Sequence, residues 1–293
     1  MVLAPKLLAI LMIVSTMLGA GLQVDVRRIA DTLRQYGLLA RALLANFVLV
    51  PLVAVVLVRI FRVDVGAATG IVLMSMAPGV PFLVNSAGRK EGGSLSFALT
   101  IAFCFAALSV VTVPVTMWLV LPHTADAQLP VGSFLTTLVL FQLVPLIVGA
   151  VVAPRLSQVS ADKAVQILHL VFFAAALVLV ALVFPRLAGY VASIYGFGRL
   201  LIIMAIGLFS LAVGWLLGGP AQDYRRTLSI GTLMRNIGLC ALIGTSATFA
   251  NTLVVPAIFA YFVVTFILSL PLRAYYIRSK PTLTPAHSGK TGP

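Results

Sequence analysis

Residues 230–238 read Ile230-Gly231-Thr232-Leu233-Met234-Arg235-Asn236-Ile237-Gly238 and place an arginine inside an otherwise apolar stretch. All the other basic residues, and all seven Asp and Glu, fall in predicted loops, helix ends or tails. A charge at the centre of a bilayer costs at least about 2.5–3.5 kcal/mol on insertion scales, so such a residue generally faces a cavity or a partner. Arg235 therefore predicts a substrate or ion path at this depth.

The composition indicates a membrane protein. The chain has 293 residues, of which 61% are hydrophobic and 9% charged, and its mean hydropathy is +1.13. A soluble fold of this size cannot bury so much apolar surface, whereas a membrane-spanning helix takes about 20 apolar residues. The predicted fold class is an all-α polytopic membrane protein without a soluble domain. Cys104 and Cys240 both lie in apolar segments, so no disulfide is indicated.

Nine hydrophobic segments are long enough to predict transmembrane helices. They cover residues 7–24, 37–60, 66–87, 93–120, 131–153, 164–185, 198–218, 226–249 and 252–277. Residues 279–293 predict a disordered tail. Residues 7–22 also resemble a signal peptide, but only Lys6 precedes them and no small-residue cleavage site follows, so we expect a retained helix.

The net charge of +13 follows the loops between these segments. One set of loops and the tail carry 14 basic residues and the other set carries five, in consistent alternation. The positive-inside rule explains this charge bias better than a nucleic-acid partner does. We therefore expect the protein to lie in a lipid bilayer and to bind no nucleic acid. We therefore predict a cytoplasmic C-terminus and an N-terminus outside. The short loops favour a bacterial inner (plasma) membrane.

Two of the segments are interrupted. Residues 75–81 place Pro78, Gly79 and Pro81 in mid-segment, and residues 230–238 hold two glycines beside Arg235. The two interruptions lie five segments apart, and matched interruptions in two halves of a chain indicate a transporter's midplane site. Backbone groups freed by a break must face protein, water, ion or substrate. A simple proline kink is the alternative.

Short motifs along the chain are similar to those of one carrier family. They lie at residues 17–22, 25–28, 78–79, 95–100, 226–230 and 234–239. On these motifs, nearly the whole chain resembles the bile acid:sodium symporter family. The resemblance implies an inverted-repeat transporter with panel and core domains and two broken, crossing helices.

The same resemblance implies the domain organisation. The family has ten helices in two five-helix repeats, and this chain lacks the first helix. We expect a first repeat of four helices in residues 1–130 and a second of five in residues 131–278, followed by a cytoplasmic tail, 279–293. An N-terminus outside agrees with the loop charges.

Candidate site residues also follow from the resemblance. The substrate-binding candidates are Arg235, Asn236, Asn46, Pro78, Gly79 and Asn85. The candidates for a residual sodium site are Ser96, Thr100, Gly231 and Thr232. Asn46 falls where the family has a glutamine, and Asn85 is the nearest match to a displaced polar pair. No catalytic residue, cofactor or other metal is expected.

Two departures from the family bear on sodium. Gly231 stands where the family has a glutamate, and Arg235 stands where it has a glutamine. The loss of a carboxylate and the gain of a nearby guanidinium both disfavour a bound cation in a low dielectric. We expect that one or both sodium sites are lost. Arg235 is then a substitute for sodium, a direct ligand of the substrate, or a cap on carbonyls of the third segment.

The predicted function is a secondary transporter of a small organic anion, by alternating access, with altered or lost sodium coupling. Bile acid-like molecules, keto acids and similar carboxylates all remain possible substrates. An auxin-efflux-type carrier and a non-transporting membrane sensor are the alternatives. An enzyme is disfavoured because the acidic residues form no D-x-x-D or H-E-x-x-H motif. Two small-residue motifs, Gly66-x-x-x-Gly70 and Gly214-x-x-x-Gly218, predict close helix packing and leave the oligomeric state open.

Overall fold

The computed structural model describes residues 3–24, 34–79, 92–120, 131–193, 196–246 and 253–279. Every regular element in these ranges is helical, and seven of the helical stretches are long and apolar enough to cross a membrane. These are Leu3–Leu22, Tyr36–Ile60, Leu95–Leu119, Phe134–Arg155, Gln158–Pro185, Gly196–Leu217 and Val254–Arg278. The chain is therefore a multi-pass helical membrane protein, as the composition predicts.

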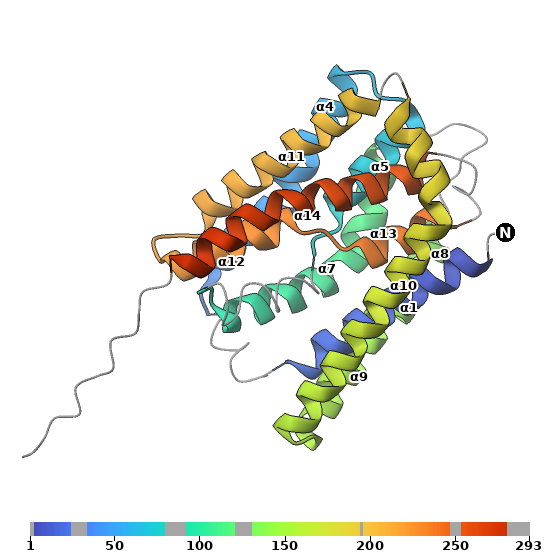
Figure 1. Ribbon diagram of the computed structural model, residues 1–293. Coiled ribbons are helices and arrows are strands. Elements are labelled where there is room, and N and C mark those ends of the chain that lie inside the picture. Colours follow the sequence, from blue (N-terminus) through green and yellow to red (C-terminus); the bar gives the residue numbers. More distant parts are fainter. Residues whose placement is uncertain are drawn as a thin grey trace, which may run out of the picture.

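The elements follow one another along the chain as short and long helices (Figure 1). They are α1 (Leu3–Leu22), α3 (Tyr36–Leu44), η1 (Ala45–Leu49), α4 (Val50–Ile60), α5 (Val65–Met76), α7 (Leu95–Val120), α8 (Val131–Leu138), η2 (Val139–Leu143), α9 (Val144–Val152), η3 (Ala153–Arg155), α10 (Gln158–Ala192), α11 (Gly196–Leu217), α12 (Gln222–Leu233), α13 (Ile237–Gly244) and α14 (Val254–Arg278).

Seven continuous spans are described where nine were predicted, and the two interrupted segments account for the difference. The third segment forms α5, which ends at Met76, before the Pro78-Gly79 step. The eighth forms α12 and α13, which are separated by residues 234–236. Proline cannot continue a helix hydrogen-bond ladder, which explains the first break. Neither interrupted segment is one continuous helix.

Two spans carry a π-helical turn that ends two residues before a proline. η1 precedes Pro51, and η2 precedes Pro145. Since proline has no N–H and its ring crowds the carbonyl four residues earlier, the preceding turn widens. Each wide turn carries a fully buried amide, Asn46 in η1 and Gln142 in η2.

α10 is longer than the predicted segment 164–185, because it runs for 35 residues from Gln158 to Ala192. At 1.5 Å per residue it is about 52 Å long, beyond the roughly 30 Å hydrocarbon core. The Ser157 side chain caps its start by accepting from the Ser160 N–H at 3.2 Å. The apolar pattern missed this first turn and a half because its residues are polar.

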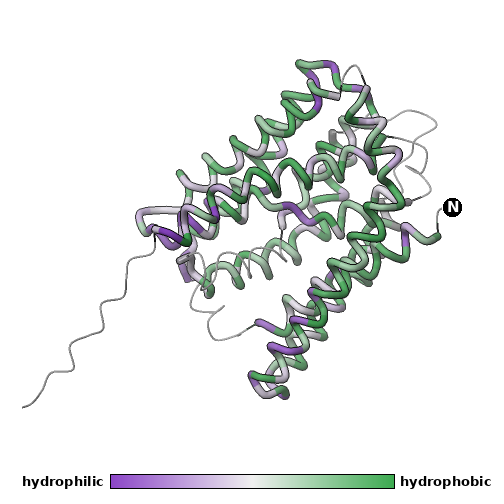
Figure 2. Tube along the Cα trace, in the orientation of Figure 1, coloured by the Kyte–Doolittle hydropathy of each residue, from purple (hydrophilic) through white to green (hydrophobic). Residues whose placement is uncertain are grey.

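The helices pack in two groups, which meet where α1 contacts α13 and α7 and where α10 contacts α14 and α11. α1 lies along α9 and α10, whereas α11 packs on α12 and α14, and α5 packs on α14 (Figure 1). α13 and α7 both contact α1. Figure 2 shows that the connection between α12 and α13 is hydrophilic within a largely hydrophobic interior. Large apolar side chains such as Leu177 and Leu216 point outward, as expected of lipid-facing helices.

The two interrupted segments meet through their backbones. Residues 77–79 and 234–236 run antiparallel, with a single bridge between Pro78 and Arg235. The Gly79 N–H donates to the Met234 carbonyl at 2.9 Å, and the Asn236 N–H donates to the Ala77 carbonyl at 3.0 Å. Backbone groups that the breaks release from helices therefore satisfy one another, as a membrane interior requires. We call residues 77–79 and 234–236 the crossing.

Small residues permit the close approaches on which this packing depends. A Cβ on Gly70 would lie 2.5 Å from the Val254 carbonyl oxygen of α14, and one on Gly214 would lie 2.6 Å from the Leu228 carbonyl oxygen of α12. Both small-residue motifs therefore serve helix packing within the chain, as predicted. At the crossing, a Cβ on Gly79 would lie 2.4 Å from the Met234 carbonyl oxygen.

Gly79→Ala is expected to lower the free energy of unfolding by about 1–3 kcal/mol, because the added methyl group must push the paired backbones apart. The thermal unfolding midpoint in detergent measures the effect. Gly37→Ala is the matched control, since a Cβ there meets nothing within 4 Å, and alanine favours a helix by up to about 1 kcal/mol. Equal midpoints for Gly79→Ala and the unaltered protein would contradict the described crossing.

Candidate functional site

Arg235 lies buried at the crossing. Its side chain is 1% exposed and is the largest among the fully buried side chains of the described residues. Its Nη1 donates to the Asn46 Oδ1 at 3.3 Å. Its Nε and Nη2 are buried and have no hydrogen-bond partner. A guanidinium is held charged at any physiological pH, so a fixed positive charge with two unused donors lies in the protein interior.

Asn46 joins the second span to the crossing. Its Nδ2 donates to the Thr232 Oγ1 at 3.2 Å and to the Ala42 carbonyl at 3.0 Å, while its Oδ1 accepts from Arg235. The widened turn η1 carries this side chain into the interior. Three of the residues that the sequence singled out, Asn46, Thr232 and Arg235, therefore form one hydrogen-bonded cluster, which we call the polar cluster.

Tyr261 of α14 lies beside this cluster. Its ring is fully buried. Its hydroxyl lies close enough to the Arg235 guanidinium to interact with it, but the two make no hydrogen bond of standard geometry. No sequence pattern selects this tyrosine, because it lies in an apolar segment without a break. The other neighbour that interacts with Arg235 is Cys240, whose thiol donates to the Leu73 carbonyl at 3.7 Å.

No acidic side chain balances Arg235 within the described part of the chain. Its described partners are Asn46, Tyr261 and Cys240, none of which carries a carboxylate. In those same residues there is also no group of three or more His, Cys, Asp or Glu that could hold a metal ion. The polar cluster is therefore electropositive, and its charge is not balanced by a described side chain.

Three predicted site residues form the crossing itself, and a fourth lies outside the described residues. Asn236 caps α13, because its Oδ1 accepts from the Leu239 N–H at 3.1 Å. Pro78 and Gly79 supply the paired backbone of the crossing. Asn85 lies outside the described residues.

The candidates for a residual ion site are divided between two helices. The Thr100 hydroxyl donates to the Ser96 carbonyl at 2.9 Å, within α7. α7 meets α12 through the Ser94 N–H, which donates to the Thr227 Oγ1 at 2.8 Å. Gly231 is buried in the last turn of α12 and contributes no side chain. The described hydrogen bonds therefore join Thr232, but neither Ser96 nor Thr100, to the polar cluster.

The other buried amide, Gln142, lies elsewhere. Its Nε2 donates to the Ala106 carbonyl and, at 2.6 Å, to the Ser109 Oγ, both on α7. Its Oε1 is buried and has no hydrogen-bond partner. Gln142 therefore fastens the fifth span to α7 and takes no part in the polar cluster.

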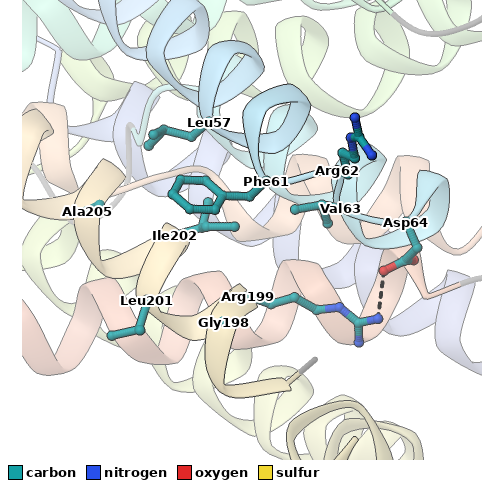
Figure 3. Close-up of a pocket in the computed structure, with 10 residues that line it drawn as sticks. All are labelled: Leu57, Phe61, Arg62, Val63, Asp64, Gly198, Arg199, Leu201, Ile202 and Ala205. Carbon is teal, nitrogen blue, oxygen red and sulfur yellow. Dashed lines mark ion pairs between the residues drawn. The ribbon is translucent and has the colours of Figure 1, made fainter. Parts of the chain in front are cut away.

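A pocket with a volume of about 700 Å³ lies apart from the crossing, between the end of α4 and the start of α11 (Figure 3). Its walls are mostly apolar, and its charged groups are Arg62, Asp64 and Arg199. Arg199 pairs with Asp64 at 2.7 Å, and Figure 3 shows the Arg62 guanidinium turned away from that pair. The buried charge of this pocket is thus neutralised within the protein, unlike that of the crossing.

Interrupted helices that cross around a buried charge are the architecture of a secondary transporter. The chain belongs to the sodium bile acid symporter family, whose model matches residues 10–194. It is 27% identical over 245 residues to human "Sodium/bile acid cotransporter 4", covering 78% of this chain and 53% of that protein. The chain thus spans about half the length of that curated relative. The family named from the motifs is confirmed, and it is a family of transporters.

Asn46→Leu is expected to lower the free energy of unfolding by about 1.5–3 kcal/mol, because it removes the described hydrogen bond of a buried guanidinium. Arg235→Gln alone and the double variant complete a thermodynamic cycle measured by unfolding in detergent. The loss caused by Asn46→Leu should shrink by at least half in the Arg235→Gln background. Additive effects would show that the two side chains do not interact.

Asp64→Ala is expected to destabilise the protein by about 1–3 kcal/mol. Asp64 caps α5 by accepting from the Ala67 N–H at 2.9 Å and also pairs with Arg199, which is 8% exposed. The change removes a cap and leaves a poorly solvated guanidinium without its carboxylate. Asp162→Ala, at an exposed position in the first turns of α10, is the control and should shift the midpoint little. Equal effects would contradict the described ion pair.

Proposed function

We propose that the protein is a secondary carrier of a small organic monoanion, and that Arg235 replaces a sodium ion at the crossing. One observation carries the proposal. The Arg235 guanidinium is hydrogen-bonded to Asn46, the residue that falls where related carriers have a glutamine. In this chain the Arg235 side chain itself supplies the positive charge that a bound cation would bring.

Electrostatics supports the loss of sodium from this position. Two unit positive charges 4 Å apart repel by about 4 kcal/mol at an effective dielectric constant of 20. The family's glutamate, which would offset that repulsion, is Gly231 here, and the described partners of Arg235 include no carboxylate. Transport would then proceed by uniport, by exchange or with a proton. Ser96 and Thr100, on α7, lie outside the polar cluster, and we assign no sodium ion to them.

The sign of the buried charge supports an anionic substrate. One uncompensated guanidinium in a site shielded from water attracts a monoanion. The name of the human relative associates that protein with bile acids. A bile acid-like carboxylate or a smaller organic acid fits the same charge. The family match favours this carrier over an auxin-efflux-type carrier or a non-transporting sensor.

The predicted repeat boundaries and membrane orientation belong to the same proposal. The meeting of two breaks that lie five segments apart supports repeats that divide near residue 130. The loop charges support a cytoplasmic C-terminus and a bacterial inner membrane.

Uptake into liposomes tests the proposal. The purified protein is reconstituted, and uptake of radiolabelled cholate and of pyruvate is measured under an inside-positive potential, in sodium and in choline buffers. Uptake should be equal in the two buffers within about twofold. Arg235→Gln should lose at least about tenfold, as expected when a charged binding partner is removed.

Arg199→Gln is the matched control, because Arg199 is also buried and also pairs with a neighbour but lies outside the crossing. It should keep its anion uptake per folded molecule. Uptake that requires a sodium gradient in the unaltered protein, or that survives unchanged in Arg235→Gln, would contradict the proposal.

A further inference from the structure

We infer that the free edge of the Arg235 guanidinium and the Tyr261 hydroxyl together bind the head group of the substrate, which is a monoanionic carboxylate or sulfonate. The inference rests on the proposed function and adds to it a second binding residue and a head-group chemistry.

The geometry of the guanidinium provides the first step. Of its three nitrogens, Nη1 is engaged by Asn46, while Nε and Nη2 have no hydrogen-bond partner. Nε and Nη2 form one edge of the planar group, and their N–H bonds point in parallel, as a fork that matches two oxygens of one anion. Asn46 therefore holds the guanidinium through Nη1, and the edge formed by Nε and Nη2 is left for a ligand.

Tyr261 provides the second step. Its hydroxyl is buried beside the Arg235 guanidinium, yet the two make no hydrogen bond of standard geometry. Buried polar groups are almost always hydrogen-bonded, so two unsatisfied groups side by side require an explanation. A hydroxyl has a rotatable O–H, so Tyr261 can donate to the same oxyanion as the guanidinium fork, and an oxyanion has lone pairs for all of these donors.

The charges select the class of head group. The described partners of Arg235 are neutral, so one negative charge balances the site and a neutral amide leaves the guanidinium unpaired. Cys240 does not compete for the anion, because its thiol faces the Leu73 carbonyl. Tyr261 lies on α14 and Arg235 between α12 and α13, so one anion contacts both the crossing and the last helix.

Thermal unfolding of the purified full-length protein tests the inference. The probes are the potassium salts of butanoate and butane-1-sulfonate, with butanamide as the uncharged analogue and potassium chloride as the ionic-strength control. Ligands that bind only the folded state raise its midpoint by mass action. Both organic anions should raise the midpoint in a saturable manner, and butanamide should not.

Two variants separate binding from structure. Tyr261→Phe should change the anion-free midpoint little, because its hydroxyl makes no hydrogen bond of standard geometry. It should raise the half-saturating anion concentration about tenfold. Arg235→Lys keeps the charge but not the fork and should weaken binding further. Tyr190→Phe is the matched control, since the Tyr190 hydroxyl is likewise buried without a hydrogen-bond partner but lies near Arg199, outside the crossing. It should leave the anion response intact.

The inference is overturned if neither anion raises the midpoint at 100 mM beyond the chloride control. It is also overturned if Tyr261→Phe lowers the anion-free midpoint by several degrees and leaves anion binding intact. Transport that still requires Arg235 in either case leaves the proposed function standing. Conversely, anion binding as predicted without any transport removes the proposed function and retains the head-group site.

Discussion

The backbone pairing of residues 77–79 with residues 234–236 is the constraint on which the rest of the structure depends. A helix that stops inside a membrane releases N–H and C=O groups that hydrocarbon cannot satisfy. Here the two breaks satisfy each other through the Gly79 and Asn236 N–H groups. The pairing fixes α5, α12 and α13 relative to one another, and Gly79 permits it because any larger residue meets the Met234 carbonyl.

The same pairing determines where Arg235 lies. The residue is held in extended backbone between two helices, so its side chain enters the interior instead of lying along a helix surface. Asn46 then reaches it from a turn widened by a proline. Three local departures from regular helix, two breaks and one π turn, thus converge on one guanidinium. This convergence favours a functional origin for the distortions over independent proline kinks.

Much of the site was predictable because its signals are local. Proline and glycine in mid-segment predict breaks wherever they occur, and a lone arginine in an apolar stretch indicates a functional position. The meeting of the two breaks and the involvement of Asn46 came from the family resemblance. In the structure the two breaks pair through their backbones, and Asn46 accepts a hydrogen bond from Arg235. In contrast, the contact with Tyr261 depends on the packing of α14, which no local pattern encodes.

Other predictions were limited by what hydropathy measures. Apolar length marks a segment but does not distinguish a continuous helix from two short ones, so nine segments correspond to seven continuous spans in the described residues. The polar first turns of α10 and the capping role of Asn236 also escape an apolar pattern. Both depend on hydrogen bonds between side chains and helix ends. Such bonds can be assigned only after the ends of the helices have been located.

The central claim is that the Arg235 guanidinium occupies the position of a cation, and the binding of sodium tests it most directly. The thermal unfolding midpoints of the unaltered protein and of Arg235→Gln are compared in sodium, potassium and choline chloride at equal ionic strength, where an ion that binds the folded state raises the midpoint. The account predicts that sodium gives the unaltered protein no stability beyond potassium. A sodium-specific rise in the unaltered protein that Arg235→Gln leaves unchanged would contradict it.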